Sequence, residues 1–448
     1  VIGEKISPEL VLTHLPFQEK VEQALQRQER KERVGFLDKK RLELFERARL
    51  FQAVAQGSIP GFFPQPGDPR AGWIPLAGLR DLERRAVLEK EYSPSEVAEI
   101  QGALGRLFRE IREGEKDSLL ETASAFRHSL GNLLESRGIV LDQFRLDAER
   151  AYHRIRPFHW AWILYLASAL LWFLVRGRFQ VLPLIFFGAG FLAHSLGFIQ
   201  RSLIALRPPV SNMYESVIWV AWAALFFSMI LGLVYRKSIL PAVAAWVAAF
   251  SLLIGESFPA VLDPSLSPLV PVLRNNYWLT VHVLTITLSY GAFALAWGLA
   301  HAVLWVFAFR SKGGEDPEVL SQYLYRALQI GVVLLAAGTI LGGVWANDSW
   351  GRFWGWDPKE TWALIALFGY LAVLHGRFAG WLGSFGTAIG SILAFSGVLM
   401  AWYGVNFVLA AGFHSYGFSG GGLPYVLAAV LLDLIFVSFL AFRYNKLH

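Results

Sequence analysis

Nine apolar segments in the last two-thirds of the chain constrain its fold more strongly than any other feature. A helix needs roughly 20 apolar residues to cross a hydrocarbon core about 30 Å thick. Backbone that faces lipid must satisfy its own hydrogen bonds, and a helix does so. We therefore predict an all-α, polytopic membrane helix bundle with nine spans. The predicted spans are residues 158–175, 181–202, 213–235, 239–254, 279–309, 328–345, 361–375, 385–403 and 425–442.

Charged residues are concentrated before these segments. Asp, Glu, Lys and Arg account for 51 of the 156 residues in 1–156 but for only 25 of the 292 residues in 157–448. So few charges would leave an apolar surface facing water, and we place the second part in a bilayer. We expect residues 1–156 to form a soluble, mainly helical domain and residues 157–448 to form the transmembrane domain.

Local patterns predict the elements of the first domain. Apolar residues at helical spacing predict helices. The run Ser93-Pro-Ser-Glu predicts a helix start, because a Ser and a Glu three residues later can cap the backbone. The proline- and glycine-rich segment 57–78 predicts a loop or extended chain. The predicted helices are residues 19–51, 79–90, 97–112, 117–137 and 140–156.

The absence of cysteine excludes several functions. The chain cannot form a disulfide, supply a thiolate ligand or exchange thiols, and without a CxxCH motif it is not a c-type cytochrome. Its net charge of +6 does not indicate nucleic acid as a partner, because no basic stripe with aromatic platforms lies outside the membrane part. Arginine and lysine beside the predicted spans account for the charge.

Basic residues between the predicted spans fall on alternate connections, and the positive-inside rule places that side in the cytoplasm. The C-terminus is then cytoplasmic, and residues 1–156 are extracytoplasmic. The basic residues that support this orientation are Arg176, Arg178, Arg236, Lys237, Arg310, Lys312, Arg377, Arg443 and Lys446. Those that lie on the opposite side are Arg201, Arg207, Arg274, Arg352 and Lys359.

A tryptophan-rich segment, residues 345–362, joins the sixth and seventh spans on the predicted outer face. Tryptophan is common at membrane interfaces, and anchoring accounts for one or two of these residues. It does not account for a cluster interspersed with glycines and acidic residues. Glycines let a loop bend close to a flat ligand, and indole faces offer it a stacking surface, so the segment suits a porphyrin. Five of the chain's 17 tryptophans lie here: Trp345, Trp350, Trp354, Trp356 and Trp362.

Two histidines flank this segment on the same predicted face. His282 lies at the outer end of the fifth span, and His414 lies in the last outer loop. Two neutral imidazoles on opposite sides of one iron are a known haem ligation. Taken singly, each histidine is explained more simply as an interfacial hydrogen-bonding residue. Together, on either side of the tryptophan-rich segment, they predict the two ligands of a haem iron.

Three further histidines lie inside predicted spans, where ionisable residues are costly and suggest a function. His375 and His301 lie at comparable depths toward the cytoplasmic side, and His194 lies nearer the middle of its span. Each is a candidate haem-binding residue. The alternative is a neutral histidine that is hydrogen-bonded to a neighbouring helix.

Three segments resemble one family of haem-handling membrane proteins. Asp357-Pro-Lys-Glu-Thr-Trp-Ala-Leu and the tryptophans before it resemble the WWD signature. Arg207-Pro-Pro-Val-Ser-Asn-Met-Tyr-Glu-Ser precedes the third span, and Val405-Asn-Phe precedes His414-Ser-Tyr-Gly. Together they resemble the CcsA/ResC family, the haem-handling subunits of System II cytochrome c synthetases, over about residues 157–448.

The resemblance implies a function at the outer face of the bacterial inner membrane. Non-covalent haem b is taken from the cytoplasmic side and presented outside, with His282 and His414 on the iron. The thiols of a CxxCH motif in apocytochrome c then add to the haem vinyl groups, kept reduced by a thioredoxin-like partner. Asp357 either orients the haem loop during this reaction or caps the seventh span. His375 matches an inner haem site, whose second ligand comes from a ResB/CcsB-like subunit.

Fused synthetases carry further spans before this module, and this chain carries one charged helical domain there. Three explanations for this difference are open. The ResB/CcsB-like part is a separate partner, the chain is a fragment of a longer protein, or residues 1–156 are a divergent substitute. Two rival functions also remain open. One is a haem transporter or chaperone without ligase activity. The other is an unrelated proton-linked transporter that uses intramembrane histidines and Asp433.

The predicted orientation can be tested with reporter fusions. A reporter fused after His448 is expected to be active only in the cytoplasm, because the basic connections share that side. A reporter fused after residue 206, between the second and third spans, should give the opposite result and serves as the control. Activity of the His448 fusion only outside the cytoplasm would contradict the nine-span orientation.

Overall fold

The computed structural model places two units along the chain, Val1–Asp142 and Gln143–His448. Each unit is described separately below. The residues that the structure describes are 7–29, 35–55, 61–63, 74–75, 92–113, 116–139, 142–175, 179, 181–236, 239–259, 261–266, 276–309, 316–409 and 422–447.

The first unit is mainly helical, as predicted. The predicted helices at 97–112 and 117–137 are confirmed, and the one at 79–90 lies outside the described residues. Two short strands pair antiparallel within the segment predicted as loop or extended chain. The elements are α1 Pro8–Thr13, α2 Leu15–Glu29, α3 Phe36–Ala55, β1 Gly61–Phe63, β2 Ile74–Pro75, α5 Pro94–Glu113 and α6 Lys116–Ser136.

Helix α5 begins with the predicted capping box. The Ser93 N–H donates to Glu96 Oε2 at 2.7 Å, and the Glu96 N–H donates to Ser93 Oγ at 3.3 Å. Arg137 adds a third contact, with 3.1 Å between its guanidinium nitrogen and Glu96 Oε2. The Ser93 N–H and hydroxyl, together with Arg137, hold the pKa of the Glu96 carboxyl below its usual value. The pair α5 and α6 packs around Tyr92, Ile100 and Leu133.

The second unit is a helix bundle, and the part that is described holds nine helices long and apolar enough to cross a membrane. This confirms the predicted polytopic membrane fold. The elements are α7 Gln143–Ile155, α8 Pro157–Leu174, α9 Val181–Ala205, α10 Met213–Tyr235, α11 Ile239–Ser257, α12 Asn276–Trp278, the π-helical η4 Leu279–Val283, α13 Leu284–Ala308, α14 Pro317–Trp350, α15 Pro358–Phe378, α16 Ser384–Leu399, the π-helical η5 Met400–Leu409 and α17 Leu423–Leu447.

The boundary between the units lies before α7, whereas the charge distribution placed it after this helix, at residue 156. Helix α7 carries charged residues but belongs to the bundle because it is bonded to α9. The Arg145 guanidinium donates twice to the Ile204 carbonyl, at 3.1 Å and 2.5 Å. Arg156, at φ 50°, turns the chain between α7 and α8. A cation of this charged helix, Arg145, thus serves as a contact to the bundle.

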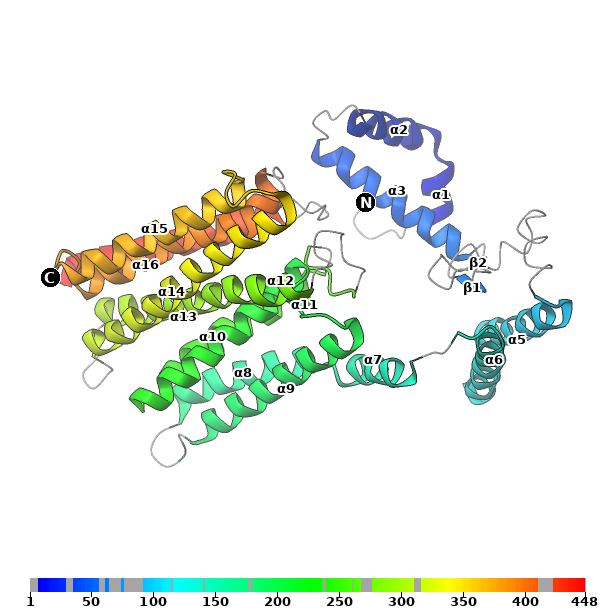
Figure 1. Ribbon diagram of the computed structural model, residues 1–448, viewed down its shortest axis with the longest axis horizontal. Helices are drawn as coiled ribbons and strands as arrows, with labels where there is room; N and C mark the ends of the chain where they lie inside the picture. The colour runs from blue at the N-terminus through cyan, green and yellow to red at the C-terminus, as the bar shows by residue number, and fades with distance from the viewer. Residues whose placement is uncertain are drawn as a thin grey trace. The chain divides into compact units, whose positions relative to one another are not determined.

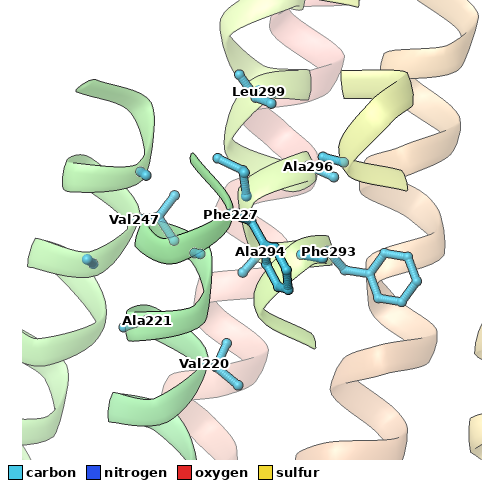
Figure 2. Packing of buried hydrophobic residues seen from close by; sticks show 14 of the residues in the cluster. Val220, Ala221, Phe227, Val247, Phe293, Ala294, Ala296 and Leu299 are labelled. Carbon is cyan, nitrogen blue, oxygen red and sulfur yellow. The ribbon is translucent and has the colours of Figure 1, made fainter. Parts of the chain in front are cut away.

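Helix α13 is the centre of the bundle, and Figure 1 shows it between the α8–α11 group and the α14–α16 group. Small residues allow close packing, which holds membrane helices together where lipid is as apolar as their side chains. A Cβ at Gly291 would lie 2.3 Å from that of Ala223 in α10. Figure 2 shows Ala294 of α13 beside Phe227 of α10, while the Phe293 ring points away from α10 and α11. That ring stacks on Tyr370 of α15, with 3.7 Å between the ring centroids.

A buried ion pair joins α9 to α10 at the end where α10 begins. Arg201 and Glu215 lie 2.7 Å apart, and both side chains are only 1% exposed. Arg201 also donates to Tyr152 Oη at 3.1 Å and to the Pro264 carbonyl at 2.9 Å. The second carboxylate oxygen of Glu215 accepts from the Ser211 N–H at 2.8 Å. The pair thus fixes the segment that leads into α10.

Glu215→Gln is expected to lower the thermal midpoint of the purified protein markedly. It leaves the Arg201 guanidinium buried without its counter-charge, and breaking such a pair typically costs about 3–5 kcal/mol. The control is Glu256→Gln. Glu256 pairs with Arg156 and is about a third exposed, and pairs of that kind contribute roughly 0–1 kcal/mol. Equal midpoints for the two variants in a detergent melting series would show that the Arg201–Glu215 pair does not hold the bundle.

Candidate functional site

The described residues line a cavity at the end of the bundle where α10 and α15 begin. About 150 Å³ of it is open to the centres of water-sized molecules, and a single water needs only about 10–15 Å³ by this measure. Its walls come from the segment before α10, from η4 with the start of α13, from α14, from the start of α15, and from η5. Both π-helical segments thus line it, and such segments recur at functional sites.

His282 forms one wall of this cavity from η4. Its Nδ1 lies 2.9 Å from the Gly338 carbonyl oxygen of α14, and its ring centroid lies 5.5 Å from that of Trp345. A Cβ at Gly342 would lie 2.7 Å from His282 Cε1, so the ring fits only against a glycine. A ring that donates Nδ1–H to a carbonyl carries its lone pair on Nε2, which is how metal-binding histidines are commonly oriented.

Only some of the predicted tryptophans line the cavity. Trp345, which is 3% exposed, and Trp354 are on its wall with His282. Trp356 is 69% exposed and meets Trp354 edge to face at 5.8 Å. Within the described residues, Trp350 and Trp362 are not part of the lining.

The loop that carries the tryptophans is also shorter than expected. Helix α14 continues to Trp350 and ends at Gly351, which has φ 71° and donates its N–H to the Asn347 carbonyl. The connection to α15 is therefore residues 351–357, and Trp345 lies on a helix. A buried Trp345 and an anchored Asp348, which accepts from the Trp278 indole at 2.9 Å, explain why the helix extends this far.

Asp357 faces the backbone of α15. Its carboxylate accepts from the Lys359 N–H at 2.9 Å, while Glu360 Oε2 accepts from the N–H groups of Gly355 and Asp357. These bonds form a capping box, and Asp357 is 4% exposed. Of the two roles expected for Asp357, the geometry favours the helix cap, because its side chain is not among the described lining of the cavity.

Three residues that were not predicted as site residues, Lys359, Trp402 and Asn406, complete the wall. Lys359 Nζ donates to Asn406 Oδ1 of η5 at 3.2 Å, and the Asn406 amide donates to the Trp402 carbonyl at 3.1 Å. The Trp402 indole in turn donates to Ser216 Oγ of α10 at 2.9 Å. A chain of hydrogen bonds therefore links α15, η5 and α10 along the cavity. Lys359 and Asn406 lie within the two family-like motifs, but nothing in either motif indicated that they meet.

The segment before α10 carries the third motif, and part of it lines the cavity. Arg207 opens this segment. Burial lowers the pKa of its guanidinium, Arg201 adds to this effect, and the Glu215 carboxylate opposes it. Arginine nonetheless stays protonated in proteins. This end of the bundle therefore holds two cations close to one buried carboxylate.

The three histidines predicted inside spans lie apart from this cavity. His194 is fully buried, with Nδ1 3.2 Å from Tyr165 Oη and its ring stacked on Phe198. His301 Nδ1 lies 2.9 Å from the Trp297 carbonyl oxygen, and its Nε2 lies 2.9 Å from Asp433 Oδ1.

His375 is exposed, with Nδ1 2.7 Å from the Leu371 carbonyl oxygen of its own helix. His414 lies outside the described residues.

Comparison with known proteins places this membrane protein in cytochrome c biogenesis. The family model described as "Cytochrome C assembly protein" matches residues 210–413. CcsA of Prochlorococcus marinus subsp. pastoris is 35% identical over 259 residues, which are 51% of this chain and 80% of that protein. CcsA of Chlamydomonas reinhardtii is 34% identical over 224 residues, 47% of this chain and 61% of that protein. The chain belongs to the CcsA/ResC family.

The protein NrfI of Wolinella succinogenes is 33% identical over 417 residues, which are 88% of this chain. That share is larger than the second unit, so the similarity includes part of the first. The chain spans only 43% of the length of NrfI. Every described residue on the cavity wall falls inside the range of the family model.

Gly342→Ala is expected to lower the haem content of the purified protein, because its methyl group would take the space of the His282 ring. Overpacking typically costs about 1–3 kcal/mol, which corresponds to about 5- to 150-fold in affinity if the whole cost falls on the haem-bound form. Gly188→Ala is the matched control, since a Cβ there meets nothing within 4 Å. Pyridine-haemochrome assays at equal protein would measure both. Equal haem content in the two variants would mean that the position of His282 does not matter for haem.

Proposed function

We propose that this chain binds haem b in the outer cavity, with His282 as one axial ligand of the iron, and promotes its attachment to apocytochrome c. The observation that carries the proposal is the position of His282. Its Nδ1 is held by the Gly338 carbonyl, and its ring borders a cavity that also holds the indoles of Trp345 and Trp354. Aliphatic and aromatic walls with a few placed polar groups are typical of ligand sites.

His414 is proposed as the second axial ligand. It follows η5 in the sequence, and η5 supplies the cavity wall that carries Trp402 and Asn406. Two histidines from segments far apart in the chain would hold the macrocycle from its two faces, while indoles contact its flat surface. This arrangement requires no thiolate from the protein, which has no cysteine.

The reaction is an addition in which nothing is lost from either reactant. Each thiol of the CxxCH segment places its sulfur on one carbon of a vinyl group and its hydrogen on the other. The protein accelerates such a step by holding both reactants in one orientation, which can replace much of the entropic barrier. Asp357 and Glu360 are engaged in capping α15, so we assign neither as a general base.

The proposal includes partners that supply what this chain lacks. Both thiols come from apocytochrome c, and a thioredoxin-like reductant keeps them reduced. A ResB/CcsB-like subunit, either separate or part of the same longer protein, completes the assembly. This part of the proposal is supported by NrfI, in which the region similar to this chain is only 43% of the protein. The proposed setting is the bacterial inner membrane, with the cavity outside and the C-terminus in the cytoplasm.

His375 is proposed as a ligand of haem entering from the cytoplasmic side. Its Nδ1 faces the Leu371 carbonyl, as the Nδ1 of His282 faces that of Gly338, so the Nε2 lone pair is directed away from its helix. The side chain is exposed on this chain, where a partner can reach it. His301 and His194 instead face Asp433 and Tyr165, which favours structural roles for both.

A haem transporter or chaperone without ligase activity would use the same cavity. Co-expression with an apocytochrome c separates the two functions, because a ligase leaves haem covalently attached to the CxxCH segment. Family membership sets aside the unrelated proton-linked transporter.

Purified protein is expected to contain haem with a low-spin, bis-histidine spectrum when reduced. His282→Gly should lose this spectrum and regain it with added imidazole, because a small ligand can occupy the vacated iron position. His159→Gly is the matched control, since His159 lies at the start of α8 and is paired with Glu256 away from the cavity. Covalent haem on the co-expressed cytochrome should follow the same pattern. Protein that takes up no haem on titration, or a His282→Gly variant with an unchanged spectrum, would overturn the proposal.

A further inference from the structure

One hydroxyl on the cavity wall has no hydrogen-bond partner in the described part of the structure. It belongs to Tyr290 of α13, which lies on this wall with its ring beside that of Trp402, at 6.0 Å between the centroids. Only 5% of Tyr290 is exposed. A buried hydroxyl has lost its hydrogen bonds to bulk water, and such groups normally have another partner. A ligand of the cavity can supply that partner.

The other hydroxyls on the described wall differ from that of Tyr290, because each donates its single hydrogen to the protein. Ser211 donates to the Glu215 carboxylate at 2.6 Å. The rest donate to backbone carbonyls three or four residues earlier in their own helices, and they are Ser216, Thr287 and Thr339. Among the hydroxyls of this wall, Tyr290 is therefore the one that offers its hydrogen to a ligand.

Tyr290 lies deeper in the bundle than His282, on the same face of a continuous helix. His282, Ile286 and Tyr290 follow one another at intervals of four residues, and all three line the cavity. The rise from His282 to Tyr290 is about 12 Å along the helix axis. A tyrosine on a helix directs its side chain back toward the N-terminus of that helix, which here is the end that carries His282. The hydroxyl thus faces the space on the inner side of the imidazole ring.

The only oxygen atoms of haem b are those of its propionates, so only a propionate can accept a hydrogen bond from Tyr290 through oxygen. The two pyrrole rings that carry the propionates lie opposite the two that carry the vinyl groups. Thiols that arrive from outside must reach the vinyl groups at the outer end of the cavity. The propionates of a haem bound in that orientation face the inner end, where Tyr290 lies.

The charged side chains on the described wall do not determine this orientation by themselves. Lys359 and Glu360 are neighbours of opposite sign in the first turn of α15, at the outer end of the cavity. Their effects on a propionate therefore oppose each other. A donor at the inner end can decide the orientation, because a hydrogen bond to a carboxylate is roughly twice as strong as one between neutral groups.

We propose that the Tyr290 hydroxyl donates a hydrogen bond to a propionate of the haem in this cavity and thereby holds the vinyl edge toward the outer end. This inference rests on the proposed function, because it assumes that haem enters the cavity. Tyr290 is then a binding residue that determines orientation. It contacts the edge of the macrocycle opposite the reacting vinyl groups.

The test compares two iron porphyrins on the full chain. Iron mesoporphyrin keeps the propionates and has ethyl groups in place of the vinyl groups, while iron etioporphyrin has ethyl groups at the propionate positions too and contains no oxygen. Spectroscopic titrations give the ratio of their affinities for wild-type protein and for Tyr290→Phe, which removes only the hydroxyl. Tyr370→Phe is the matched control, because the Tyr370 hydroxyl is also buried without a described partner but is not on the described wall.

Tyr290→Phe is expected to lower the preference for mesoporphyrin over etioporphyrin by about 10- to 100-fold, the usual strength of a hydrogen bond to a charged group. The loss should fall on mesoporphyrin, while the affinity for etioporphyrin should change little. Tyr370→Phe should keep the wild-type ratio. Partition of each compound into detergent affects every variant alike and cancels when their ratios are compared.

Two results would overturn the inference and leave the proposed haem function standing. An unchanged ratio in Tyr290→Phe would mean that the hydroxyl bonds only to water in the cavity. Equal weakening of both porphyrins would mean that the hydroxyl supports the wall and does not contact a propionate. Wild-type protein that binds neither porphyrin, nor haem itself, would instead remove the proposed function, and with it the role of Tyr290.

Discussion

The close approach of α14 to α13 determines the geometry of the outer site. At Gly338, a Cβ would lie 2.8 Å from the Cα of Ile286, so the two backbones nearly touch. This contact brings the Gly338 carbonyl within 2.9 Å of His282 Nδ1. One turn later, Gly342 leaves the space that the imidazole ring occupies. A bulkier residue at either glycine would separate the helices or displace the ring, so the orientation of His282 follows from helix packing.

Much of the fold could be predicted because hydropathy alone determines it. Apolar segments must cross the bilayer as helices, and all nine predicted spans were found. The ends of helices were less predictable, since they depend on tertiary contacts. Helix α14 runs past the predicted boundary because Trp345 is buried and Asp348 binds the Trp278 indole. Helix α7 belongs to the bundle because Arg145 reaches the Ile204 carbonyl.

The candidate site was predicted only in part, because its geometry also depends on tertiary contacts. Residue type and position were enough to select His282, Trp345 and Trp354. They could not show that Lys359 meets Asn406, 47 positions away, or that Trp402 meets Ser216, 186 positions away. Such contacts arise only when the spans pack. Periodicity within one segment carries no information about them.

The histidines predicted inside the spans have different roles, and the residues around each one distinguish these roles. Helix α17 buries little of its surface, with 11% of its most apolar window buried, and lipid gives no hydrophobic drive for it to join the bundle. Polar contacts must therefore hold it. His301 and Trp297 of α13 meet Asp433, and Arg443 donates to the Ala308 carbonyl at 2.9 Å. His301 is thus explained by the attachment of α17, whereas His375 has an exposed ring and no such bond to another helix among the described residues. His375 therefore stays the candidate haem ligand among these histidines, because its ring is exposed and has no hydrogen bond to another helix among the described residues.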